Sequence, residues 1–160
     1  MSLTTLLENG NLSIAAIPAY YLLAQAPHAA ALIYTTNGKV SKWENVNPKG
    51  EATKTAINKK IGPQRYAVYE RLKAAHANCM ENMPLFIAAI VFGNMAGLHK
   101  VEGSGGLNWF AGSFLLARAG YNIVYALNAT QGQSYLRTLF WLLSVGQCFR
   151  VLFTAASILV

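Results

Sequence analysis

The sequence is poor in charged residues, and this scarcity argues against a soluble protein. Only 12% of its 160 residues are charged, and six of them are acidic. An ordinary soluble domain contains about 25% charged residues. At this length the chain corresponds to a single domain, so its composition favours one domain in a largely apolar environment.

Cysteines and the familiar catalytic motifs are also scarce. Cys79 and Cys148 both lie within apolar segments, where we interpret them as buried thiols that pack as small apolar side chains. They form no disulfide framework, zinc-binding spacing or C-x-x-C motif. The sequence has no glycine-rich nucleotide loop, no H-E-x-x-H and no G-x-S-x-G. We therefore expect no metal site, and nucleotide, zinc-hydrolase and serine-hydrolase chemistry lack support.

Four apolar segments are long enough to cross a membrane, which takes about 20 helical residues for roughly 30 Å of hydrocarbon. They cover residues 12–34, 75–98, 107–127 and 135–160. The N-terminus lacks the basic region and cleavage site of a signal peptide, so we expect the first segment to direct insertion. The sequence therefore predicts an all-α integral membrane four-helix bundle in the lipid bilayer.

Most of the positive charge lies in one connection, the 35–66 loop. The formal net charge is +7, and seven of the 13 lysines and arginines lie between Lys39 and Arg65. A basic chain can bind nucleic acid, but the apolar flanking segments favour a membrane protein, and we expect no nucleic-acid partner. The positive-inside rule places the 35–66 loop in the cytosol, with both termini on the opposite side.

Polar residues gather where the second apolar segment begins. Residues 71–86 read RLKAAHANCMENMPLF. A carboxylate at the start of a membrane-spanning helix has a high free-energy cost unless it is paired with a cation or has a functional role. Helical spacing places Arg71, Asn78 and Glu81 on one side, with Ala74 between them. This pattern predicts a polar pocket inside the bundle.

A second polar stripe lies on the third segment. Arg118, Tyr121 and Tyr125 are spaced by three and four residues, and Arg137 lies where the fourth segment begins. We expect these side chains to converge with those of the second segment in the cytosolic half of the bundle. A purely structural interpretation is also open, in which Arg118 and Glu81 form an interhelical ion pair.

The side chains of this pocket suit a small zwitterionic ligand that carries a carboxylate. The arginines and Lys73 donate to carboxylates, whereas Glu81 accepts from an amine. A lipophilic substrate would enter from the bilayer. His76 is expected to pack or cap, with proton transfer as the alternative role.

Two motifs resemble those of the MAPEG superfamily, the membrane-associated proteins in eicosanoid and glutathione metabolism. They are ERLKAAHANCMENMPLF at residues 70–86 and ARAGYNIVY at residues 117–125. The resemblance implies a homotrimer of four-helix subunits in the endoplasmic reticulum or another internal membrane. It also implies glutathione held at subunit interfaces facing the cytosol, by Arg71, Lys73, Asn78, Glu81, Arg118, Tyr121 and Tyr125.

Two departures from the family pattern concern glutathione activation. Ala74 stands where glutathione-using members usually have an arginine, and no arginine follows Tyr125 before Arg137. A neighbouring cation lowers the pKa of a thiol and so creates the nucleophilic thiolate. Arg137 is therefore the candidate for this role.

Three functions are open at this stage. The first is a glutathione-dependent transferase, peroxidase or isomerase, with Arg137 stabilising the thiolate. The second is a glutathione-independent cyclase or isomerase of a lipophilic metabolite. Its candidate catalytic residues are Glu81, His76, Tyr121 and Tyr125. The third is a non-enzymatic lipid-binding scaffold.

Overall fold

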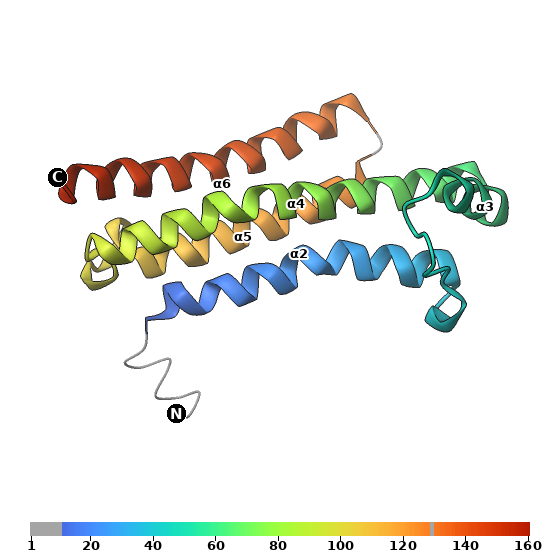
Figure 1. Ribbon diagram of the computed structural model, residues 1–160. Coiled ribbons are helices and arrows are strands. Elements are labelled where there is room, and N and C mark those ends of the chain that lie inside the picture. Colours follow the sequence, from blue (N-terminus) through green and yellow to red (C-terminus); the bar gives the residue numbers. More distant parts are fainter. Residues whose placement is uncertain (1–10, 129) are drawn as a thin grey trace.

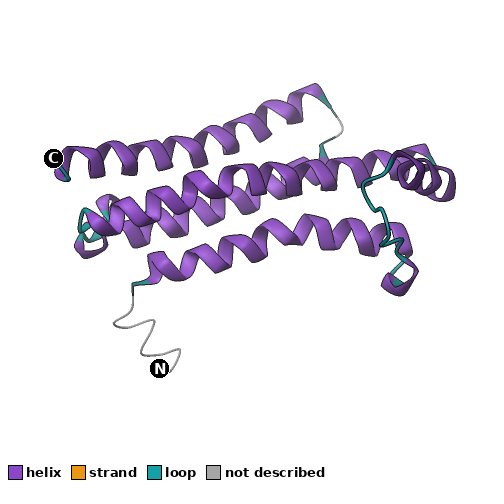
Figure 2. Cartoon of the chain, viewed as in Figure 1, coloured by secondary structure: helices purple, strands orange, loops and turns teal. Residues whose placement is uncertain are grey.

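The computed structural model describes residues 11–128 and 130–160, and these form helices joined by short connections (Figures 1 and 2). The α-helices are α2 (Leu12–Thr36), α3 (Glu51–Ile61), α4 (Pro63–Met95), α5 (Leu107–Leu127) and α6 (Gln131–Ile158). Three single-turn 3-10 helices are η1 (Val40–Lys42), η2 (Leu98–Lys100) and η3 (Gly103–Gly105). These residues contain no strand, which confirms the all-α class.

The four long helices α2, α4, α5 and α6 run alternately in opposite directions (Figure 1). Helices α4 and α5 lie in the middle; α2 packs against both from one side and α6 packs against both from the other. The α2–α4 connection lies at the same end as the last turn of α5 and the first turn of α6, and we call this the α3 end. Residues from α4, α5 and α6 are thereby brought together near this end.

The 35–66 segment is more structured than the loop predicted from sequence, because it contains α3 and the start of α4. Helix α3 has Glu51 in its first turn and lysines in its last, which complements the helix dipole. Gly62, with φ of +80°, ends α3 and precedes Pro63 at the first position of α4. Proline favours this position because its φ is already helical and its missing N–H has no intrahelical role there.

The apolar core lies where α2, α4 and α5 meet, and aromatic rings fill it. Phe86 and Phe114 stack with ring centroids 4.2 Å apart, and Tyr20 meets both rings edge-on. All three side chains are buried, and each such burial contributes about 1.5–3 kcal/mol. The Tyr20 hydroxyl donates to the Cys79 carbonyl at 2.9 Å, so its polar end is satisfied inside the core.

The tight turn before α5 requires glycine at position 106. A Cβ atom there would lie 1.9 Å from the Val101 carbonyl oxygen, which belongs to the backbone and cannot rotate away. We expect Gly106→Ala to lower the free energy of unfolding by about 1–3 kcal/mol, measured by thermal unfolding in detergent. Gly112→Ala is the control, because a Cβ there meets no atom within 4 Å; equal stabilities of the two variants would contradict the prediction.

Among the described helices, α6 alone is long and apolar enough to cross a membrane by length and composition. It has 28 residues, and its most apolar stretch has a mean hydropathy of 1.5. Large apolar side chains on α6 are exposed, namely Leu136, Leu139, Leu142, Leu143, Phe149 and Phe153. Helix α5 occupies the same residues as the third predicted segment, but it carries Arg118 and Asn122, both of which are buried.

Candidate functional site

A polar cluster centred on Arg118 lies between α4 and α5. The Arg118 side chain is 0% exposed. Its Nη2 donates to Asn78 Oδ1 at 2.8 Å and lies 3.3 Å from Cys79 Sγ. Its guanidinium carbon lies 4.4 Å from the centre of the Tyr121 ring. The side chains at 78, 118 and 121 are therefore brought together, and 118 and 121 share one face of α5 as the helical spacing predicted.

Arg118 has no acidic partner within residues 11–128 and 130–160. The ion pair found there joins Lys54 and Glu51 on the surface of α3, so the Arg118–Glu81 ion pair considered from sequence is not formed. The Nε and Nη1 atoms of Arg118 are buried without a hydrogen-bond partner in this part of the chain. A buried charge left unpaired costs several kcal/mol, so this guanidinium is suited to receive an anionic group.

Two neighbouring cavities open beside the cluster. Arg118 itself lines neither of them, but Asn78 and Tyr121, which contact its guanidinium, line the first. The first has a volume of about 270 Å³ and is lined by Asn78, Tyr121, Tyr125, Arg137, Thr138 and Trp141. The second has a volume of about 390 Å³ and is lined by Ala67, Glu70, Arg71, Ala74, Tyr125, Asn128 and Arg137. Tyr125 and Arg137 border both cavities.

Arg137 and Arg71 give this region its positive charge. The Arg137 guanidinium lies over the Tyr125 ring at 4.6 Å from its centre, a cation–π contact. Arg71 Nε donates to the Ala126 carbonyl at 3.4 Å, which links α4 to the last turn of α5. An acceptor is present as well, because Asn128 Oδ1 is buried without a partner among the described residues. The lining thus presents cationic donors and at least one free acceptor.

Lys73 and His76 lie apart from this cluster, against α2. Lys73 Nζ is 3.0 Å from His28 Nδ1, and His76 Nδ1 is 2.8 Å from the Ala24 carbonyl oxygen. The rings of His28 and His76 lie 5.1 Å apart. Positions 73 and 76 are turned by roughly 200° and 140° from position 71 on an ideal helix. The structure therefore places neither side chain in the pocket with Arg118. This is contrary to our expectation for Lys73, whereas the contact of His76 with the Ala24 carbonyl fits a packing role and not the alternative role in proton transfer.

Glu81 also lies outside the cluster, on the exposed surface of α4. Within the described parts of the chain, no basic side chain pairs with it. Its neighbour Asn82 donates to the Asn78 carbonyl at 2.8 Å. Asn78 is therefore anchored to its own helix and presents its side-chain oxygen to Arg118.

The pKa of Lys73 predicts a rise in stability with pH. Partial burial and the nearby Lys49 ammonium lower the pKa of Lys73 from its ordinary value of 10.5. The folded chain therefore binds fewer protons at this site than the unfolded chain, and stability increases as pH rises from the folded pKa towards 10.5. Lys73→Met should reduce this rise, measured by thermal unfolding between neutral pH and about pH 10.

Lys39→Met serves as the control for that measurement, because Lys39 lies exposed in the α2–α4 connection. Identical pH profiles for the wild type and Lys73→Met would show that the Lys73 environment does not favour the neutral amine.

Sequence reasoning missed the side chains that complete the cluster. Cys79 Sγ lies 3.1 Å from Asn122 Oδ1, and Asn122 Nδ2 donates to the Leu23 carbonyl of α2 at 3.3 Å. Asn122 is four residues after Arg118, and Trp141 is four residues after Arg137. That spacing places each pair on the same face of its helix. The sequence could therefore have indicated Asn122 and Trp141 as further members of the site.

The fold and the cluster define a class of α-helical chain in which a buried arginine, without an acidic partner in the described parts of the chain, lies beside a polar cavity between helices. The family model of the MAPEG family matches residues 14–157, and the chain belongs to this family. It is therefore a membrane-associated protein of the glutathione and eicosanoid metabolism type, which confirms the resemblance noted in the sequence. No curated protein and no solved structure matches the chain.

Proposed function

We propose that this MAPEG protein is a glutathione-dependent enzyme that acts on a lipophilic substrate, by transfer to an electrophile, peroxide reduction or isomerisation. The observation that carries the proposal is Arg118, which is fully buried with two guanidinium nitrogens unpaired among the described residues. The free-energy cost of burying this guanidinium charge is offset when an anion binds to it. The adjoining cavities are bordered by Arg71 and Arg137, so a ligand with several anionic groups fits best.

The free acceptor and the arginines together fit the chemistry of glutathione. Its two carboxylates suit Arg118 and Arg71, and its amine suits Asn128 Oδ1 and the Glu70 carboxylate in the second cavity. When bound, glutathione supplies a thiol that is nucleophilic once it is deprotonated. We assign stabilisation of that thiolate to Arg137, because it borders both cavities and its guanidinium is always charged.

We further propose that α2, α4, α5 and α6 all cross the membrane and that three copies associate. Arg118 and Asn122, the polar side chains in the interior of α5, are buried, so lipid need not contact them. Glu81 is exposed on α4, and a carboxylate facing lipid is costly, which favours a neighbouring subunit there. The basic α3 end would face the cytosol, in the endoplasmic reticulum or another internal membrane.

Isothermal titration of the detergent-purified protein with glutathione tests the proposed function. We expect saturable binding, together with ultraviolet absorbance of the thiolate that appears below the ordinary thiol pKa of about 8.5. S-methylglutathione is the matched control, because it keeps the carboxylates and the amine but cannot form a thiolate. The absence of binding at millimolar glutathione would refute the proposal.

A glutathione-independent cyclase or isomerase is the second candidate, and one observation favours it. Ala74 borders the second cavity at the position where glutathione-using relatives carry an arginine. The cavity is consequently less cationic than the family pattern implies. Turnover of a lipophilic substrate that is equal with and without glutathione would support this candidate and exclude the first.

A further inference from the structure

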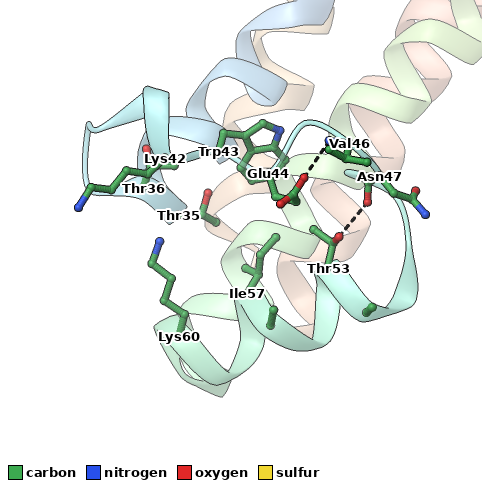
Figure 3. A pocket seen from close by; sticks show the side chains of 12 residues that line it. Thr35, Thr36, Lys42, Trp43, Glu44, Val46, Asn47, Thr53, Ile57 and Lys60 are labelled. Carbon is green, nitrogen blue, oxygen red and sulfur yellow. Dashed lines mark hydrogen bonds between the residues drawn. The ribbon is translucent and has the colours of Figure 1, made fainter.

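A separate cavity of about 590 Å³ lies at the α3 end (Figure 3). Its walls come from the last residues of α2, the connection that follows, and α3. None of the residues that border the two cavities beside Arg118 lines it. Its volume falls within the range of about 300–1,000 Å³ that is common for small-molecule sites, and nothing in the proposed glutathione chemistry uses it.

One part of this cavity is apolar. Ala52, Ala56 and Ile57 of α3 border it together with Trp43, and Figure 3 shows Ile57 between α3 and the α2 end. Ile57 is the buried residue of α3. An 11-residue helix is marginal by itself and depends on packing its apolar face. Ile57 already shares an apolar cluster with Tyr69 and Leu72 of α4, and an apolar occupant would add contacts beside it.

One side of the cavity is positively charged, because two lysines lie there. Figure 3 shows Lys42 and Lys60 on the same side, near Thr35 and Thr36. Within the described residues neither lysine forms an ion pair. The single acidic side chain in the lining, Glu44, accepts a hydrogen bond from the Val46 backbone N–H at 2.9 Å. The lysines are thus available to an anionic group.

Hydrogen bonds hold the walls of the cavity in place. Thr53 Oγ1 donates to the Asn47 carbonyl at 2.8 Å, which ties α3 to the connection. Arg65 Nη2 donates to the Tyr34 carbonyl and to Asn37 Oδ1, each at 2.8 Å, which ties α4 to the end of α2. A site with fixed walls loses less conformational entropy when it binds.

We propose that this cavity binds an anionic amphiphile, with a carboxylate or phosphate at Lys42 and Lys60 and an apolar chain against Trp43 and Ile57. Charge complementarity supplies the head-group end, and the apolar side chains of α3 and Trp43 supply the chain end. Such a molecule comes either from an anionic membrane lipid or from a free fatty carboxylate. The proposal does not depend on glutathione binding.

The test is isothermal titration of the full chain in phosphatidylcholine nanodiscs with octanoate as the probe. We expect saturable binding that is weakened at least about tenfold in Lys42→Gln/Lys60→Gln. The matched control is Lys39→Gln/Lys59→Gln, which removes the same charge from the same region at residues outside the lining, and it should bind as the wild type does. Octan-1-ol, which lacks the charge, should bind at least about tenfold more weakly than octanoate.

Ala56→Trp provides an independent variant, because it fills the cavity without changing charge. It should abolish octanoate binding while circular dichroism shows an unchanged helical content. Three results would each overturn the proposal. The first is octanoate binding of equal strength in the two double lysine variants, and the second is octan-1-ol binding as strong as octanoate binding. The third is octanoate binding by Ala56→Trp that equals that of the wild type.

The two sources are separated by adding phosphatidylserine to the nanodiscs. Competition that weakens octanoate binding in the wild type, and equally in the octanoate-binding control Lys39→Gln/Lys59→Gln, identifies the lipid head group as an occupant. Octanoate binding that is unchanged by phosphatidylserine identifies the free carboxylate. Both results support an anionic amphiphile site.

Discussion

Arg118→Met is expected to raise the free energy of unfolding and to weaken glutathione binding strongly, two effects of opposite sign. In the chain without ligand, the Arg118 guanidinium is fully buried and has no carboxylate partner among the described residues. Replacing a buried charge by an apolar side chain of similar length is often stabilising by about 1–4 kcal/mol. The same change removes the donors that the proposed function assigns to a glutathione carboxylate, so we expect binding to weaken by roughly 100-fold or more.

Thermal unfolding and isothermal titration of the same preparation measure both effects. Arg150→Met is the matched control, because Arg150 is exposed on α6 and donates to the Ser104 carbonyl at 3.1 Å, away from the cluster. It should leave glutathione affinity unchanged. A large loss of stability in Arg118→Met would show instead that the arginine mainly holds α4 and α5 together.

The spacing of residues along each helix predicted which side chains share a helix face. It did not predict which neighbouring helix packs against that face. The stripe of Arg118, Tyr121 and Tyr125 follows directly from the helical repeat, and the structure places Asn78 against it. Lys73 and His76 belong to the same polar run in the sequence, yet they face α2. Residues close in sequence on a helix can point to opposite neighbours, so a dense polar run does not define one pocket.

Helix α3 was not predicted because its signals are electrostatic rather than apolar. Its sequence offers one buried side chain, Ile57, which is too few for a periodic apolar pattern. Glu51 in the first turn and Lys59 and Lys60 in the last favour a helix through the dipole. The same lysines made the segment resemble a plain basic loop. The cavity beside α3 depends on tertiary structure and had no sequence signal.

Arg137→Leu is expected to impair the chemistry of the proposed reaction more than the binding of glutathione. Arg137 lies near the start of α6, and its guanidinium lies 4.6 Å from the centre of the Tyr125 ring, at the border of both cavities. Without its charge, the pKa of a bound thiol should rise towards about 8.5. We expect the rate at pH 7 to fall by roughly 100-fold, whereas the glutathione Kd changes by less than about tenfold.

The pH profile separates this role from a structural one. If Arg137 stabilises the thiolate, the defect of Arg137→Leu should shrink as the pH is raised above about 8.5, because the free thiol then ionises without help. Arg137→Lys keeps the charge but loses the planar stacking surface, so it should recover part of the rate and keep a lower thiol pKa than Arg137→Leu. A defect that is constant across pH, or an Arg137→Lys variant as impaired as Arg137→Leu, would instead assign Arg137 to positioning Tyr125 and the walls of the two cavities.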